Sequence, residues 1–495
     1  MISPSTRRLA AFPLVILATG VPMFMATLDN LVMTNALPVI HADLGASIEN
    51  LQWFVNAYTL AFSSLILMAV ALGDRLGRRT VFVAGIALFT MASVSAALST
   101  DPTQLIVARA FQGLGAAGIM PLSLSLLAGS VPKHRRPLAI GIWGGVAGLG
   151  VAAGPLVGGA VVQGWDWHAI FWINVPVGLI AIPLALLVLP GGRGTRAPLD
   201  VAGMLLAGLG VLGIVYGIVR GNDAGWGSPE VIGALTLGVA LLVGFVLWER
   251  RAAAPLLPLR LFRDRSFTLA NVVGLGFSFG IFGAVFILIQ FLQVVQGATP
   301  LEAAVQTMPW TMAPMIVAPI AGLIAPRVGT RALIVAGLTL QAGALTWLGL
   351  TLTADAPYSE MLPAFLAAGI GMSLVFAPSS TAVLANIAEA DTAKAAGSNS
   401  TMREIGTALG IAVLTAVFTG AGGELTPTGY VDAARPAVLV GAAALALTAI
   451  VAVFLPAGRS LPSRSAPSTA ALPAVAAAPP APSIPSPVPV SSAVS

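Results

Sequence analysis

Long apolar segments follow one another along most of the chain, and short polar loops separate them. Fourteen segments approach or exceed the ~20 residues that an α-helix needs to cross the hydrocarbon core of a bilayer. This pattern predicts an all-α membrane protein with 14 transmembrane helices. The segments lie near residues 11–36, 51–72, 80–99, 104–128, 138–161, 169–190, 199–219, 231–248, 267–292, 302–325, 332–353, 361–387, 397–420 and 436–456.

The composition agrees with a protein built for a bilayer. Hydrophobic residues make up 57% of the chain and charged residues 9%, whereas about a quarter of the residues in a soluble protein are charged. The absence of cysteine excludes disulfides and thiolate metal sites. No group of side chains has metal-ligand spacing, so we expect no metal and no cofactor. Neither lysine lies in a phosphate-binding glycine loop, so internal ATP hydrolysis is not indicated.

The distribution of basic residues predicts the orientation in the membrane. If the N-terminus is cytoplasmic, 20 of the 24 lysines and arginines fall on the cytoplasmic side. Only Arg220 and Arg435 then lie in outer loops, and Arg109 and Arg403 lie within predicted helices. We therefore expect a multi-pass protein of the cell membrane with both termini in the cytoplasm.

An internal repeat divides the chain. Asp74 to Gly85 reads DRLGRRTVFVAG, and Pro326 to Gly337 reads PRVGTRALIVAG. The fifth and thirteenth predicted helices share a glycine spacing as well, since Gly141, Gly150 and Gly154 recur as Gly397, Gly406 and Gly410. A parallel repeat of this kind is a transporter architecture, with the binding site between the two halves.

The repeat predicts four parts of the chain. Residues 1–192 form an N-terminal six-helix bundle, 193–255 contain two inserted helices, and 256–458 form a C-terminal six-helix bundle. The remainder, 459–495, is rich in proline, alanine and serine, so we expect a disordered cytoplasmic tail.

The fifth predicted helix is crowded with glycine. Gly150, Gly154 and Gly158 recur at every fourth position and form one smooth stripe, which lets another helix approach closely. Gly159 adjoins the stripe, and Pro155 inside it removes one backbone hydrogen bond and favours a bend. The segment is either a tightly packed structural helix or a helix that slides and bends against its neighbour.

Four ionisable residues lie within predicted helices: Asp29, Arg109, Arg403 and Glu404. Each costs at least ~2.5–3.5 kcal/mol at the centre of a bilayer, so each is a candidate for function. Asp29 and Arg109 lie at a similar depth, ~12 Å from the outer end of their helices by the helix rise. We expect them to pair, either as a proton carrier and its regulator or as a fixed buried ion pair.

Arg403 and Glu404 are adjacent on the thirteenth helix, where successive side chains point about 100° apart. Glu404 is a second candidate for proton coupling. It could attract a cationic substrate, carry a proton or simply neutralise Arg403, and the sequence leaves these alternatives open.

Polar and aromatic residues in other helices are candidates for a substrate site. They are Trp53, Asn56, Tyr58, Gln290, Gln293 and Trp310. Polar packing between helices explains their positions equally well.

Several motifs resemble those of one transporter family. The loop Gly73-Asp74-Arg75-Leu76-Gly77-Arg78-Arg79 is similar to the signature loop of the major facilitator superfamily, although Val70 stands where a glycine is usual. Arg109, Gln112 and Gly113 resemble its fourth-helix motif, and the glycine stripe with Pro155 resembles its antiporter motif. Leu28-Asp29 and the segment Trp172 to Gly178 are similar to the fourteen-helix drug:proton antiporter branch, where glutamine is common at the position of Glu404.

This resemblance implies two six-helix bundles that alternate in access and export amphiphilic drugs or antibiotics in exchange for protons. It also implies gating by the signature loop and by the fifth helix, with Asp74 as a latch between helix ends. Otherwise the loop charges Asp74, Arg75, Arg78 and Arg79 only set the topology. The expected partners are a small amphiphilic substrate, protons and the lipid bilayer; we expect no nucleic acid, and a monomer. A transporter of another metabolite is the alternative, and a membrane enzyme is a remote one because no nucleophile–base pair stands out.

Overall fold

The computed structural model describes residues 4–132, 135–192, 200–253, 255–387 and 391–456. Fifteen α-helices occur in these ranges, with no strand among them. Their bounds are α1 Pro4–Leu44, α2 Ile48–Leu76, α3 Arg78–Ala97, α4 Pro102–Ser130, α5 Arg136–Gly164, α6 Ala169–Trp172, α7 Asn174–Val188, α8 Val201–Ala224, α9 Pro229–Glu249, α10 Arg265–Val294, α11 Pro300–Val328, α12 Thr330–Thr351, α13 Tyr358–Leu384, α14 Thr392–Gly420 and α15 Pro427–Val453. The 3-10 helix η2 spans Leu259–Arg263. The predicted tail, 459–495, lies outside the described residues.

Each predicted apolar segment falls on one helix, except the sixth, which contains the two helices α6 and α7. Among the described residues, 11 helices are long and apolar enough to cross a membrane. The count rises to 12 if α2, which bends by 50° between Ile66 and Met68, is one span. The prediction of an all-α, multi-pass membrane protein is confirmed, and the number 14 stays a prediction.

The two copies of the sequence repeat adopt the same local structure. Gly77 separates α2 from α3 with φ of 102°, and Gly329 separates α11 from α12 with φ of 93°. Both values lie in a region that side chains rarely adopt, which explains why glycine occupies both positions. At the end of each repeat a glycine packs against backbone: Gly85 of α3 against α4, and Gly337 of α12 against α13.

The glycine stripe of α5 packs against α1. A Cβ on Gly154 would lie 2.7 Å from Leu31 Cβ, and one on Gly158 would lie 3.0 Å from Val32 Cα. Gly150 meets Thr27 in the same way, at 3.1 Å. The equivalent glycines of α14 pack on the backbone of α10, so the repeat extends to the helix pairs α1–α5 and α10–α14.

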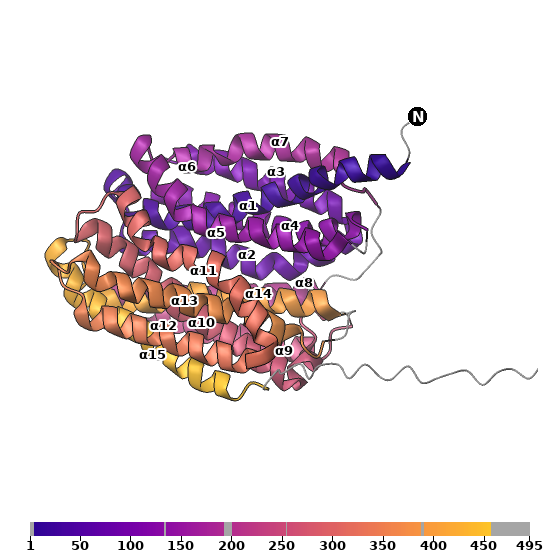
Figure 1. The fold of residues 1–495 in the computed structure, drawn as a ribbon. Helices are drawn as coiled ribbons and strands as arrows, with labels where there is room; N and C mark the ends of the chain where they lie inside the picture. The colour runs from indigo at the N-terminus through magenta and orange to yellow at the C-terminus, as the bar shows by residue number, and fades with distance from the viewer. Residues whose placement is uncertain (1–3, 133–134, 193–199, 254, 388–390, 457–495) are drawn as a thin grey trace, which may run out of the picture. The chain divides into compact units, whose positions relative to one another are not determined.

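Helices from the two repeats also contact each other. Helix α5 packs against α11, and α2 packs against α14. Gly159 makes the first of these contacts close, since a Cβ there would lie 2.6 Å from the carbonyl oxygen of Pro300. In Figure 1 the indigo and purple N-terminal helices lie above the orange C-terminal ones, with α2, α5, α11 and α14 between.

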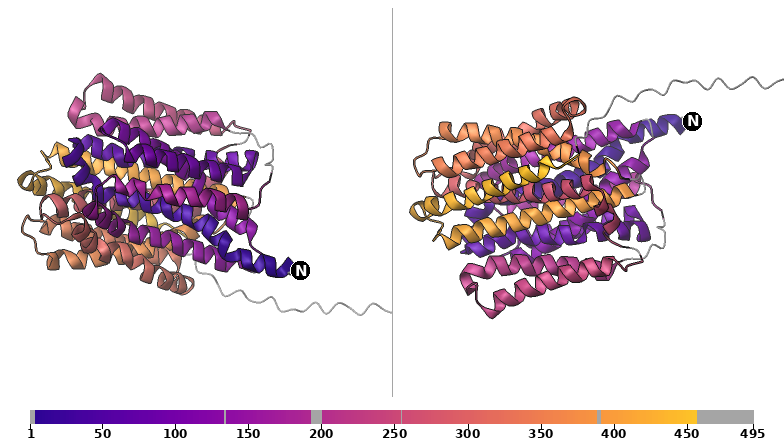
Figure 2. Two further views of the ribbon diagram at one scale, coloured as in Figure 1. Left: turned by 90° about the horizontal axis from the view of Figure 1, so that it is seen from above. Right: turned by 90° about the horizontal axis from the view of Figure 1, so that it is seen from below.

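Helices α8 and α9 form a pair at the edge of the array (Figure 2). Helix α8 contacts α2 and α14, one helix of each repeat. Arg220 of α8 bridges to Glu49 of α2 at 3.2 Å. Asn222, two residues further on, donates hydrogen bonds to the carbonyl oxygen of Ala416 and, at 2.7 Å, to the hydroxyl of Thr419 in α14.

The close contact of α5 with α1 leads to a stability prediction. Gly154→Ala places a methyl group against Leu31 Cβ, which cannot rotate away, so we expect a loss of about 1–3 kcal/mol in the free energy of unfolding. Gly164→Ala is the matched control, because no atom lies within 4 Å of a Cβ there. Thermal unfolding of both variants in detergent measures the difference, and equal unfolding temperatures would contradict the packing described.

Candidate functional site

Asp29 of α1 and Arg109 of α4 form a buried ion pair. Their side chains are 1% and 0% exposed, and Arg109 Nη1 lies 2.5 Å from Asp29 Oδ2. The pairing expected from their equal depth is therefore present. A buried ion pair is stable only if its geometry is good and further hydrogen bonds satisfy the remaining polar atoms. The stability of this pair therefore depends on the polar groups around it.

Neutral polar groups complete the surroundings of the Asp29 carboxylate. Oδ1 accepts hydrogen bonds from Asn174 Nδ2 at 2.6 Å and from Gln112 Nε2 at 3.1 Å. Ser93 of α3 lies behind them and accepts from Gln112 Nε2 at 2.9 Å and from Asn174 Nδ2 at 3.3 Å. Four helices, α1, α3, α4 and α7, thus meet at one carboxylate.

The Arg109 guanidinium is less completely paired than the carboxylate. Nε donates to the carbonyl oxygen of Phe54 in α2 at 3.0 Å, and Nη1 donates to Gln112 Oε1 at 2.9 Å. The guanidinium carbon lies 4.5 Å from the centre of the Tyr58 ring. Nη2 is buried and has no hydrogen-bond partner in the part of the chain that the structure describes. One donor group of the arginine is therefore available for another partner.

Ser93 was not predicted from the sequence, and Gln112 and Asn174 were predicted only as motif positions. Serine is common at helix contacts in membranes, so Ser93 has no distinguishing signal. Asn174 does have one, since it is a polar residue inside the otherwise apolar segment 169–190. A buried asparagine in such a segment could have been recognised as a candidate.

Arg403 and Glu404 on α14 point to different neighbours, as adjacent helix positions do. The Arg403 guanidinium carbon lies 3.7 Å from the ring centre of Phe376 in α13. Glu404 interacts electrostatically with Tyr58 of α2. Thr401, one turn before Glu404, donates to the carbonyl oxygen of Ser63 at 3.4 Å, so this face of α14 is turned toward α2.

The signature loop links four helices, α2, α3, α4 and α7, at the predicted cytoplasmic end. Arg78 binds Asp74 Oδ1 through Nη2 at 2.8 Å and also donates to Ser125 Oγ of α4 at 2.6 Å. Arg79 donates to the carbonyl oxygens of Leu186 and Leu189 at the end of α7, at 3.1 and 3.0 Å. Arg75 is exposed, and Gly73 is buried, where a Cβ would lie 2.8 Å from a methyl group of Leu122.

An apolar cavity lies between helices of the two repeats. Leu31 and Thr34 of α1 and Pro155 of α5 line one side, and residues of α10, α11 and α13 line the other. Trp310 is the one residue of the six predicted for a substrate site that lines this cavity.

The other five predicted residues have different surroundings. Trp53 packs against the Tyr216 ring of α8, with 6.2 Å between ring centres, and the Tyr58 hydroxyl donates to the carbonyl oxygen of Ala26. Gln290 donates to Phe286 of its own helix at 2.9 Å. Asn56 is buried, and its side-chain amide has no hydrogen-bond partner among the described residues.

Gln293 takes part in a junction of three helices. Its Nε2 donates to the backbone carbonyl of Asn35 in α1 at 3.0 Å. The Asn35 side chain in turn donates to the carbonyl oxygen of Pro155 in α5 at 2.8 Å. Helices α1, α5 and α10 are thereby linked beside the cavity.

These features define a multi-pass helical membrane protein with a buried ion pair in one repeat and an apolar cavity between the repeats. The family model described as Major Facilitator Superfamily matches residues 20–411. The chain belongs to this superfamily.

Its relatives include proteins named for resistance and export. The chain is 35% identical over 454 residues to the "Tetracenomycin C resistance and export protein" of Streptomyces glaucescens, an alignment that covers 91% of this chain and 84% of the relative. It is 34% identical over 406 residues to the "Multidrug resistance protein Stp" of Mycobacterium tuberculosis, covering 82% of this chain and 75% of the relative.

Solved structures agree with the fold. The crystal structure of an auto-inhibited POT family peptide transporter superposes with a TM-score of 0.66 at 16% sequence identity. The match covers 90% of this chain and 96% of that transporter. At this identity the likeness concerns the fold alone.

The ion pair leads to a second stability prediction. Arg109→Met leaves the Asp29 carboxylate without its cation, so we expect a loss of about 3–5 kcal/mol in the free energy of unfolding. Adding Asp29→Asn removes the uncompensated charge, so the double variant should be more stable than Arg109→Met alone. Unfolding of the two single variants and the double variant in detergent gives the coupling energy. Additive losses would contradict an energetically coupled pair.

Proposed function

We propose that this protein exports amphiphilic drugs or antibiotics in exchange for protons by alternating access. The observation that carries the proposal is the Asp29–Arg109 pair, a buried acid with a cation as a regulating neighbour. The names of the relatives, which refer to antibiotic resistance and export, support the direction of transport and the class of substrate. Transport of another metabolite would use the same fold, and nothing in the site favours it.

The proposed organisation follows the sequence repeat. Twelve of the fourteen spans, with α6 and α7 counted as one, form two six-helix bundles at residues 1–192 and 256–458. The inserted pair α8–α9 lies in 193–255, and residues 459–495 form a cytoplasmic tail. The protein acts as a monomer in the cell membrane, with both termini in the cytoplasm, and its partners are the substrate, protons and lipid.

Asp29 is the proposed proton carrier. In the present structure its carboxylate contacts the Arg109 guanidinium and two amide donors. Lengthening of the Arg109 contact would remove the stabilising cation and favour uptake of a proton. Arg403 and Glu404 are proposed to assist, because their helix α14 packs against α2, and Tyr58 of α2 lies beside the Arg109 guanidinium.

The glycine stripe of α5 offers a route from the cavity to the carrier. Gly150, Gly154 and Gly158 touch Thr27, Leu31 and Val32, the α1 residues on either side of Asp29. The same segments contribute Leu31 and Pro155 to the cavity. A shift of α5 along α1 on substrate binding would therefore act directly on the segment that holds the carboxylate.

The remaining proposed roles concern gating and substrate contact. The signature loop, with Gly73, Asp74, Gly77 and three arginines, is proposed to hold helix ends together when the cytoplasmic side is closed. Gly159, which packs on α11, belongs to the moving contact. Trp310 lines the cavity in the present conformation and is proposed to contact substrate there. The other predicted residues, Trp53, Asn56, Tyr58, Gln290 and Gln293, are proposed to do so only when the bundles part.

The carrier role is tested by Asp29→Asn in proteoliposomes with an imposed pH difference. The amide cannot ionise, so substrate-driven proton movement should fall to background, whereas substrate exchange without a pH difference should continue. Asp355→Asn, in an exposed loop, is the matched control and should behave as wild type. Proton movement at the wild-type rate in Asp29→Asn would exclude this residue as the carrier.

The latch role is tested by Asp74→Asn. The variant loses the charge that Arg78 binds, so we expect at least a severalfold lower export rate with an unchanged amount of protein in the membrane. Drug accumulation and immunoblots of the same cells measure both quantities. If the variant exports at the wild-type rate, the latch role is wrong and the loop charges only set the topology.

A further inference from the structure

The cavity between the repeats is small and apolar. Its free space is about 50 Å³, whereas sites for drug-sized ligands measure about 300–1,000 Å³. A drug-sized ligand therefore fits this cavity only when the helices that line it move apart. The lining comprises Leu31 and Thr34 of α1, Pro155 of α5, five residues of α10 including Phe282, Thr307, Trp310 and Thr311 of α11, and Met372 of α13.

No ionisable side chain belongs to this lining. Neither buried carboxylate is available to a ligand in the cavity. Asp29 already accepts from three donors. Glu404 lies on α14, and no residue of α14 lines the cavity. Besides Trp310, the side chains in the lining that carry a polar group are three threonines. The hydroxyl of Thr307 already donates to backbone carbonyls of its own helix.

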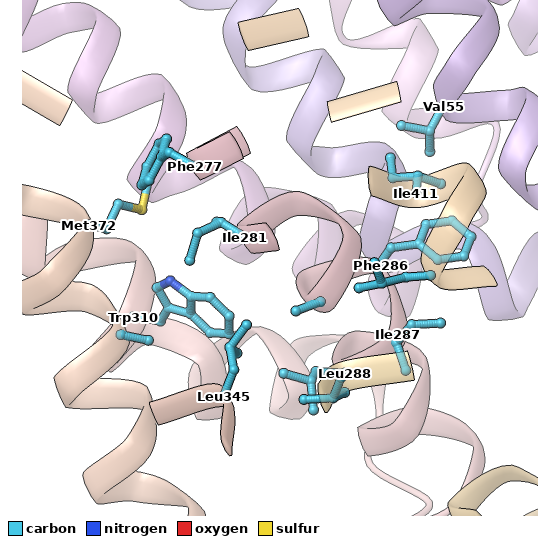
Figure 3. Close-up of a cluster of buried hydrophobic side chains, with 14 of the residues drawn as sticks. Val55, Phe277, Ile281, Phe286, Ile287, Leu288, Trp310, Leu345, Met372 and Ile411 are labelled. Carbon is cyan, nitrogen blue, oxygen red and sulfur yellow. The ribbon is translucent and has the colours of Figure 1, made fainter. Parts of the chain in front are cut away.

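Trp310 brings an unused hydrogen-bond donor to the cavity. Its side chain is 2% exposed and its ring stacks on Phe365, with 6.0 Å between ring centres. Figure 3 shows its indole nitrogen on the side of Ile281 and Met372, which also line the cavity.

Five other tryptophans donate their indole N–H to a described acceptor, and they are Trp143, Trp167, Trp226, Trp248 and Trp347. Trp310 has no such acceptor among the described residues. A buried indole N–H usually finds a partner, so a ligand atom is the natural acceptor at this position.

We propose that this cavity binds an uncharged aromatic compound that carries a carbonyl oxygen, and that Trp310 is the residue that selects it. The ring of the ligand packs against Trp310 and Phe282, and the carbonyl accepts the indole N–H. This inference rests on the proposed function, because it assigns the substrate class of the same transporter.

A permanent cation fits the cavity less well. Trp310 could attract a cation through its ring face. The cation would nevertheless lose its hydration in a site that offers no carboxylate, and this cost exceeds a cation–π contact unless a counter-charge is present. The cavity therefore selects against permanent cations.

Three probes test the proposal by binding to the protein in lipid nanodiscs, with empty nanodiscs subtracted. They are 2-(hydroxymethyl)anthraquinone, the matched 2-(hydroxymethyl)anthracene without ring carbonyls, and the permanent cation ethidium. We expect the anthraquinone to bind about fivefold more tightly than the anthracene, as one hydrogen bond provides. Ethidium should bind at least tenfold more weakly than the anthraquinone.

Trp310→Phe retains an aromatic ring and removes the N–H. Its affinity for the anthraquinone should fall to that for the anthracene, while anthracene binding stays close to wild type. Thr311→Asp adds a carboxylate to the lining and should raise the affinity for ethidium about tenfold. A preserved anthraquinone preference in Trp310→Phe, or ethidium binding equal to that of the anthraquinone in wild type, would overturn the proposal.

Transport in proteoliposomes separates this inference from the proposed function. If the probes bind in the expected order but no pH difference drives their movement, proton-coupled export is wrong and the binding site stands. If ethidium movement is proton-coupled and the anthraquinone neither binds nor moves, the export function stands and the assignment of the cavity is wrong.

Discussion

The structure depends on how a single carboxylate is held inside an apolar bundle. Asp29 is buried among helices where an unpaired charge would be unstable, and it receives Arg109, Gln112 and Asn174 as donors. Helices α1, α3, α4 and α7 supply the carboxylate and the polar groups around it, so these four helices must pack together at this point. Arg109 retains a buried nitrogen without a partner, so the pair is stable but not saturated.

The glycine stripe explains how a change around Asp29 can reach the substrate site. Glycine at positions 150, 154 and 158 brings the α5 backbone against the α1 segment on either side of Asp29. Leu31 and Pro155, which lie at this contact, also line the cavity, and Gly159 at its end packs on α11 of the other repeat. Helix α5 therefore touches the α1 segment around Asp29, the cavity and a helix of the other repeat. Larger residues at these glycines would push α5 away from α1 and so separate the cavity from the segment that carries Asp29.

Much of this arrangement could be predicted from the sequence. Apolar length predicted the helices, the repeated Asp74–Gly85 pattern predicted equivalent turns, and equal depth predicted the contact of Asp29 with Arg109. The apolar segment 169–190 also predicted one span, and Ala169–Val188 is one, because the backbone stays helical at Ile173 between α6 and α7. Helical spacing placed Gln290 and Gln293 on one face, but it could not show that Gln290 bonds to its own helix while Gln293 reaches Asn35. Side-chain partners across helices depend on packing, which spacing along one helix does not determine.

In the proposed mechanism, substrate and proton compete because substrate favours the Asp29–Arg109 contact and a proton on Asp29 opposes it. The most direct test measures the protons released when substrate binds to the wild-type protein, with a pH-sensitive dye in weakly buffered detergent. If substrate stabilises the paired arrangement of Asp29 and Arg109, saturating substrate should release up to about one proton per protein below the pH at which the carboxylate is already ionised. Substrate binding without proton release at any pH would contradict the account.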